Sequence, residues 1–536
     1  MFARESRWKR ITIGSIAIGA MALSACSSTP GDAESPAPAS ATESEASETA
    51  SVEASALDPN AVVTVGAAQA FPQLNPAIRT FAYEETLFPL LWTSLTQTRE
   101  DGTTGPLLAE SWISNAEGTE WTFTLDSGAT FSDGSPINAD EVKQSFEYYL
   151  DPETVTQEAN KLAAIASVTA PDAATVVFTM SEPNALLPEA ITWVKIIKVS
   201  ALDAINTAPV TSGPFTVASF SPDNSLEIVR NDAYWGTPAA VAGINFVKAA
   251  DATSAVTSLR NGDIDILWGT PLADAPGLQD QDGLQVIRPL VPSQAVTWEM
   301  DLTSAPFNNL SARQALAYAT NRDAILQAAY YGQGVVSTTN NILADDNPAH
   351  ASDLTQYPYD LDKAKELFAE AGITEGSTLT WWGIAGAYPE WQASGEILQA
   401  SLKEIGIDLQ IENNEIGVWV DKFYPGGKTF PGLVVPNFQS VPPEPAFSMN
   451  FLLSGRCECN WNNTEFDGLY KQAIGTVDAD ARNALWAKAQ ALENNDVPLI
   501  TPLQVAQVAG ASVNLQGVWM EGGGQIHLEN VGVATS

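Results

Sequence analysis

The sequence predicts an α/β fold, because strand-like and helix-like segments alternate along the chain. Trp121, Phe123 and Leu125 alternate with threonines, as on a half-buried strand. Residues 398–405 then place apolar side chains at helical spacing, and residues 407–411 alternate again. A chain of 536 residues is long enough for two or three ordinary domains with filled cores.

The individual elements can be assigned from local signals. Asn138 with Glu141 three residues later resembles a capping box, so a helix is expected to begin there. Apolar faces at helical spacing predict two further helices, which end before Gly372 and Gly406. Alternating patterns predict strands at residues 62–65, 121–125, 177–180, 226–229 and 407–411.

The N-terminus has the layout of a secretory signal peptide. A basic head is followed by an apolar run over residues 11–23, which is too short for the roughly 20 residues of a spanning helix. The stretch Leu23-Ser24-Ala25-Cys26 resembles a bacterial lipobox. That resemblance implies cleavage before Cys26, which removes residues 1–25 as the signal peptide, and attachment of diacylglycerol to the Cys26 sulfur. The alternative is an ordinary signal peptide with a chance cysteine.

Residues 26–57 are dominated by Ser, Thr, Ala, Pro and Glu, and no Lys or Arg offsets their acidic side chains. Such a segment cannot bury enough apolar area to offset its ordering entropy, so a disordered tether is expected. A lipid anchor followed by a tether predicts a folded body outside the cytoplasm, held at the outer face of the membrane.

Composition excludes several classes of function. Lys and Arg total 25 against 64 Asp and Glu, a formal net charge of -39, so nucleic acid is not an expected partner. The chain has two histidines, which disfavours histidine catalysis and histidine-rich metal sites. Cys457 and Cys459 either form a tight-loop disulfide or remain thiols; a local structural role is favoured, and no metal site is expected.

Several short strings occur in order along the chain. They are Leu107–Trp112 ("LLAESW", the most specific), Phe131–Val142 ("FSDGSPINADEV"), Ser212–Phe215, Arg230–Gly236, Leu259–Asp265 and Pro306–Asp323. Together they resemble the family 5 extracellular solute-binding proteins, the oligopeptide- and dipeptide-binding components of ABC importers, and they keep that family's order over roughly residues 60–470.

The resemblance implies a two-lobed periplasmic-binding-protein-like fold of type II, in the large class with mixed sheets, a hinge and an extra subdomain. Lobe 1 is expected at 58–285, with the subdomain at about 95–205. Lobe 2 is expected at 286–490, with 491–536 returning to lobe 1. The family also implies a monomer without a cofactor. It would close over a small-molecule or peptide ligand, and the permease subunits would recognise the closed form.

Peptide binders of this family hold the ligand's ammonium with an Asp in a D-x-x-E/D-P-like segment. The comparable stretch here is residues 436–445, and alignment on Glu444-Pro445 places Val441 at the Asp position. A valine cannot pair with an ammonium, so Glu444 is the candidate acid. Asn437 and Gln439 are candidate amide donors, or else belong to a solvated loop.

Aromatic side chains after strand-like runs are the other ligand-binding candidates, because they can stack on apolar, aromatic or sugar faces. Each could instead fill the core. These candidates are Phe71, Trp268, Trp298, Trp381 and Trp382.

We therefore expect a binding protein, not an enzyme, whose commonest ligand class is the short peptide. Oligosaccharides and other solutes remain alternatives, as does a sensor lipoprotein without a transport role. A hydrolase is disfavoured because no G-x-S-x-G string occurs, although acid pairs for glycoside cleavage stay open.

Overall fold

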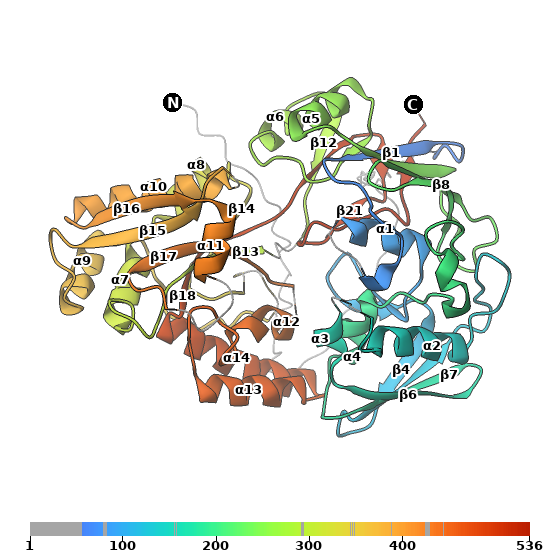
Figure 1. The fold of residues 1–536 in the computed structure, drawn as a ribbon, viewed down its shortest axis with the longest axis horizontal. Coiled ribbons are helices and arrows are strands. Elements are labelled where there is room, and N and C mark those ends of the chain that lie inside the picture. Colours follow the sequence, from blue (N-terminus) through green and yellow to red (C-terminus); the bar gives the residue numbers. More distant parts are fainter. Residues whose placement is uncertain are drawn as a thin grey trace, which may run out of the picture. The chain divides into compact units, whose positions relative to one another are not determined.

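The computed structural model describes residues 56–78, 83–154, 156, 158–290, 294–343, 345, 347, 349–386, 388–423, 429–442 and 444–535. The signal peptide, Cys26 and almost all of the tether lie outside these residues. Contacts divide the chain into Met1–Ala54 and Ser55–Ser536, and the described helices and strands all belong to the second unit. Figure 1 shows its helices and strands.

A seven-stranded sheet forms lobe 1, in the order β12-β19-β11-β1-β10-β9-β8. Its central strand β1 (Val62–Ala67) runs parallel to β10 (Gly243–Lys248) and β11 (Ile266–Leu267). Strand β19 (Ala509–Ser512) inserts antiparallel between β11 and β12 (Leu284–Ile287), so the C-terminal part of the chain completes the N-terminal sheet. The other strands are β8 (Phe215–Ser221) and β9 (Ser225–Arg230).

Helices and short hairpins cover this sheet. Ile526 in β22 donates its backbone N–H to Thr86 Oγ1 in α1, which ties the C-terminal hairpin to the first helix. The elements are α1 (Glu84–Leu91), α5 (Ala252–Asn261), α6 (Ala275–Gln279), β20 (Leu515–Gln516), β21 (Trp519–Met520), β22 (Ile526–His527) and β23 (Gly532–Val533).

The subdomain is a four-stranded antiparallel sheet, β4-β5-β7-β6, covered by α2. Asn138 accepts a hydrogen bond from the Glu141 backbone N–H, so the expected cap at the start of α2 (Ala139–Leu150) is confirmed. The strands are β4 (Ala109–Ser114), β5 (Glu120–Leu125), β6 (Ile165–Asp172) and β7 (Thr175–Met180), with α3 (Ala159–Leu162), α4 (Leu187–Ala190) and the ribbon β2 (Thr96–Thr98) and β3 (Thr104–Pro106) beside them.

Lobe 2 contains a six-stranded mixed sheet in the order β14-β18-β13-β17-β15-β16. Strand β18 (Leu499–Val505) belongs to it, so the chain leaves this sheet near residue 505 and not near 490. The other strands are β13 (Gln294–Glu299), β14 (Gly334–Val336), β15 (Thr378–Ile384), β16 (Asp408–Asn414) and β17 (Leu433–Ser440).

Four helices of lobe 2 contribute to one hydrophobic core with its sheet. Trp298 and Trp381 lie in the hydrophobic core beneath α7 (Leu310–Ala319), α8 (Arg322–Ala328), α9 (Leu361–Glu370) and α10 (Pro389–Glu404). Gly372 and Gly406 adopt φ values of 81° and 82° after α9 and α10, which glycine tolerates because it has no Cβ. The remaining helices are α11 (Ile416–Phe423), α12 (Pro445–Met449), α13 (Thr464–Ile474) and α14 (Ala479–Asp496).

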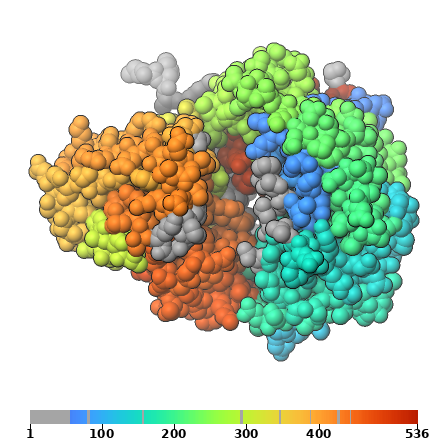
Figure 2. All heavy atoms as spheres, in the orientation of Figure 1, coloured from blue at the N-terminus to red at the C-terminus, as the bar shows by residue number. Residues whose placement is uncertain are grey.

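The subdomain contacts α13 of lobe 2. The Ala185 backbone N–H donates to the Ile474 carbonyl over 2.7 Å, and Lys471 Nζ lies 3.3 Å from Glu182 Oε2. Leu186 is buried in the same hydrophobic cluster as Phe466 and Trp486. Figure 2 shows the teal subdomain meeting the orange-red helices along the lower edge of this view.

Candidate ligand-binding site

A pocket of about 640 Å³ lies beside the segment 506–508 that joins β18 of lobe 2 to β19 of lobe 1. Lobe 1 contributes the loop 269–273 after β11, and lobe 2 contributes residues 328–331, 388–391 and 437–438. Its volume lies in the range typical of small-molecule sites, and its position between two lobes is where such sites are common.

Aromatic rings form much of the pocket wall. Tyr388 stacks on Trp391 with centroids 4.3 Å apart and an interplanar angle of 26°. Trp391 also contacts Phe438, at 5.2 Å between ring centroids. Pro389 is the first residue of α10, where its missing N–H costs nothing; Tyr388 is the N-cap and Trp391 lies in the first turn. Tyr330, fully buried, and Tyr331 complete the aromatic lining.

The polar groups of the pocket are mostly neutral. Gln294, Asn437 and Gln507 supply amides, and Glu390 is the one charged side chain among the described lining residues. Burial raises the pKa of Glu390 above its usual value. The lining within the described ranges contains no lysine, arginine or histidine.

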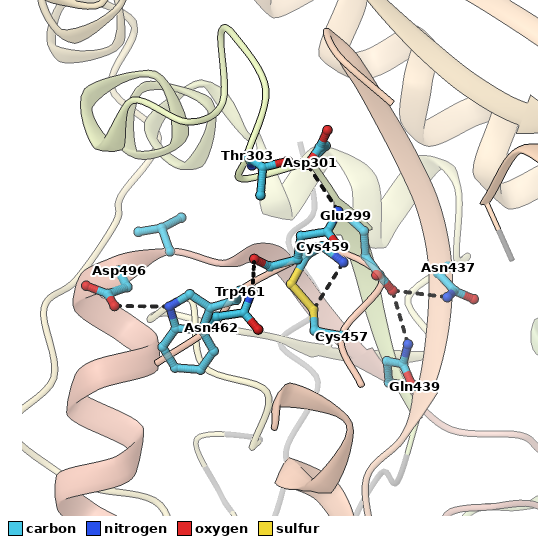
Figure 3. The surroundings of a disulfide bond; sticks show 12 residues. Glu299, Asp301, Thr303, Asn437, Gln439, Cys457, Cys459, Trp461, Asn462 and Asp496 are labelled. Atoms are coloured by element: carbon cyan, nitrogen blue, oxygen red, sulfur yellow. Dashed lines mark hydrogen bonds between the residues drawn. A yellow bond between two sulfur atoms is a disulfide. The ribbon is translucent and has the colours of Figure 1, made fainter. Parts of the chain in front are cut away.

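Asn437 and Gln439, predicted as ligand-binding amides, share a partner inside the protein. Both side-chain amides donate to Glu299 Oε1 over 3.1 Å, as Figure 3 shows. Glu299 is 1% exposed. Burial raises the pKa of Glu299 to about 7, the two amides oppose that rise, and Glu458 adds to it. Asn437 also lines the pocket, whereas Gln439 does not.

Cys457 and Cys459 form a disulfide with their Cα atoms 5.1 Å apart. The Cys459 carbonyl accepts the Leu302 backbone N–H at 2.9 Å, and Asn460 Nδ2 donates to Asp301 Oδ1 at 3.1 Å. The disulfide loop is thereby fastened to the chain that follows β13, close to Glu299 (Figure 3).

The aromatic residues selected from the sequence lie elsewhere. Trp298 and Trp381 have no exposed surface and pack edge to face in the core, 5.1 Å apart. Phe71 is buried and stacks on Tyr83 at 4.7 Å. Trp268 donates its indole N–H to the Gly524 carbonyl at 2.7 Å, and the half-buried Trp382 accepts the Trp419 indole N–H on its carbonyl.

Of the eight residues predicted to bind ligand, Asn437 alone lines this pocket within the described residues, and ligand contact stays a prediction for all eight. Sequence reasoning missed Tyr388, Trp391, Tyr330 and Phe438. The available signal was Tyr388-Pro389, which marks the start of a helix in the loop that follows β15.

Glu444 caps α12 and does not line the pocket. It accepts the Ala446 backbone N–H at 3.4 Å. Burial raises the pKa of Glu444 to about 7, with Glu189 of the subdomain adding to the rise. Val441 is 2% exposed and lies in a hydrophobic cluster.

A second pocket, of about 380 Å³, lies within lobe 1. There His527 is hydrogen-bonded to Glu521 at 3.0 Å and to Glu529 at 3.1 Å, and its ring stacks on Trp519. Burial alone would lower the pKa of His527, but Glu529 and Glu521 raise it to about 9. This arrangement is a satisfied ionic cluster that joins β21 to β22.

The described residues offer neither a metal-binding cluster nor a membrane-spanning helix. They contain no group of three His, Cys, Asp or Glu side chains placed to hold a metal ion. Within the same part of the chain, no helix has the length and apolar character needed to cross a membrane.

Two α/β lobes joined by crossing segments, with an aromatic pocket between them, define a solute-binding protein. The family model for bacterial extracellular solute-binding proteins, family 5 (middle) matches residues 103–457, and the chain belongs to this family. Its members are extracytoplasmic binding proteins of ABC importers, not enzymes, so the resemblance seen in the sequence and the fold class are confirmed.

Characterised relatives cover most of the chain. Heme-binding protein A of Haemophilus influenzae is 26% identical over 448 residues, which span 77% of this chain and 81% of the relative. The dipeptide-binding protein of Escherichia coli is 25% identical over 467 residues, spanning 80% and 86%. The solved structure of HbpA2 from Haemophilus parasuis superposes with a TM-score of 0.80 at 22% identity, covering 89% of this chain and 100% of that one.

Proposed function

We propose that this protein captures a small solute between its two lobes outside the cytoplasm and delivers it to the permease of an ABC importer. The observation that supports this most directly is the 640 Å³ pocket, whose walls come from both lobes and from the segment joining them. A ligand bound there would contact both lobes at once and so favour their closure.

Short peptides are the first ligand class to test. The dipeptide-binding relative of Escherichia coli supports them by name, while the heme-binding relative of Haemophilus influenzae shows that the family name does not fix the ligand. A non-peptide solute is the second candidate. Two observations favour it. Val441, at the position where peptide binders have an Asp for the ligand's ammonium, is buried in a hydrophobic cluster. The described pocket lining also has no cationic side chain to pair with a peptide's carboxylate.

The protein acts as a monomer held by lipid on Cys26 at the outer face of the cell membrane. The lipobox-like stretch ending at Cys26 and the acidic tether after it support this arrangement.

Uptake measured in a strain that lacks this protein tests the transport role. Radiolabelled or mass-tagged solutes that bind the purified protein are offered to the deletion strain and to the complemented strain. The proposal expects uptake to fall on deletion and to return on complementation. Binding with unchanged uptake would instead favour the sensor alternative.

A further inference from the structure

The ligand pocket combines aromatic surface with almost no formal charge. Tyr388 offers a ring that stacks on the buried Trp391, and Gln294 and Gln507 offer amide groups, whereas the Asn437 amide already donates to Glu299. Rings and amides of this kind recognise a flat apolar face bordered by hydrogen-bonding groups.

A free carboxylate has no partner in this lining. Burying an anion is unfavourable unless a cation or several hydrogen bonds to it replace water. The described residues around the pocket provide no Lys, Arg or His, and Glu390 would repel a carboxylate whenever it is ionised. The chain's formal net charge of -39 opposes an approaching anion as well.

The Trp391 indole is a hydrogen-bond donor of the pocket lining that has no partner among the described residues. The indole Nε1 of Trp391 is buried and makes no hydrogen bond within the described residues. The Trp391 side chain as a whole is 3% exposed. A buried N–H is costly to leave unsatisfied, and an indole can only donate. A ligand carbonyl, ether or hydroxyl oxygen would satisfy it once binding moves aside the side chains that cover the indole N–H.

We infer that the solute is a neutral or amine-bearing molecule with a flat apolar face and an acceptor oxygen, and that it carries no free carboxylate. This inference rests on the proposed function, since it specifies the ligand of that site. Among peptide-like molecules it selects those whose C-terminus is blocked, such as amides, over the free acids.

Matched probes test the inference. The full chain, purified in mild detergent, is titrated by thermal shift and calorimetry with a library of aromatic dipeptides, each presented as the free acid and as the C-terminal amide. Each pair differs at its end by one charge and hardly in shape. We expect the amides to bind at least tenfold more tightly than their acids.

Two variants locate the effect. Trp391→Phe keeps a ring in the wall and removes the N–H, so it should weaken amide binding three- to tenfold. Trp112→Phe, in the subdomain and outside the pocket, is the matched control and should change nothing.

Free acids that bind as tightly as their amides would overturn the inference, as would amides that fail to bind or that bind Trp391→Phe unchanged. Each of these results is distinguishable from failure of the transport role, which is measured by uptake in the deletion strain.

Discussion

The Gln439 side-chain amide donates a hydrogen bond to Glu299 Oε1 over 3.1 Å. Asn437 donates to the same oxygen, so one buried acceptor joins two residues of β17 to the end of β13. These amides are therefore committed to the interior of lobe 2. A ligand that contacted the Asn437 amide would compete with Glu299.

Glu299→Gln should make stability less sensitive to pH. The folded-state pKa of Glu299 is raised from 4.5 to about 7, so folding favours the protonated acid. Stability is lost as pH rises from 4.5 to about 7, by on the order of 3 kcal/mol. Glutamine keeps the acceptor oxygen without the charge. We expect Glu299→Gln to unfold at higher denaturant than the wild type at pH 8 and at a similar concentration at pH 5.

Glu299→Ala provides the control for this prediction. It removes the acceptor shared by the buried Asn437 amide and the half-buried Gln439 amide, so it should be destabilising at both pH values, by about 1–3 kcal/mol. A glutamine variant that was less stable than the wild type at pH 8 would show that Glu299 is ionised and stabilising there.

Glu521→Gln should weaken the ionic cluster around His527. The raised His527 pKa, about 9 against 6.5, means that its stabilising contribution is complete below pH 6.5 and is lost as pH rises through 9. Removing one carboxylate should cost about 1–3 kcal/mol at pH 6, with a smaller difference at pH 10. Chemical denaturation at both pH values measures it, and a difference that grew with pH would contradict this account.

Tyr388→Ala should reduce ligand affinity and leave folding intact. Tyr388 is 36% exposed, and it packs on Trp391 at the pocket wall, so it can be truncated without a core cavity. Loss of one stacking face predicts a fall in affinity of about tenfold, roughly 1.4 kcal/mol. Tyr359→Ala, an exposed tyrosine of lobe 2 outside the pocket, is the control for calorimetry with the natural ligand. Equal affinities in the two variants would remove Tyr388 from the site.

Cys26→Ser should release the folded protein into the medium. The lipobox-like stretch supplies the anchor in this account, so the change removes lipid without touching any residue of the folded unit. Fractionation of cells and medium, with thermal unfolding of the released protein, measures the outcome. Ser27→Ala is the matched control and should remain in the membrane fraction. Retention of Cys26→Ser in the membrane would rule out lipid as the anchor.

The sequence predicted the fold better than the site. Capping at Asn138 and the glycine ends of two helices depend on neighbours within a few residues, so local pattern is sufficient to find them. Trp381 and Trp382 are adjacent on β15, yet one is fully buried and the other half-buried, since alternate residues of a strand point to opposite faces. Local pattern does not say which face meets the pocket.

The partners of the site residues are also distant in sequence. Asn437 and Gln439 bond a carboxylate 138 and 140 residues earlier, and the pocket combines segments from residue 269 to residue 508. Pairing across such separations depends on the assembled sheets. Trp391 was missed because its position in the first turn of α10 gives no sign that it borders a cavity.

Native mass spectrometry of the mature protein, purified without denaturation, tests the central claim that it binds a small solute between its lobes. We expect a mass excess that a small organic molecule explains, with a lower occupancy in Tyr388→Ala than in Tyr359→Ala. The contradicting result is an equal ligand occupancy in Tyr388→Ala and Tyr359→Ala, or a polypeptide mass without excess from a protein that also shows no thermal response to peptide and oligosaccharide libraries.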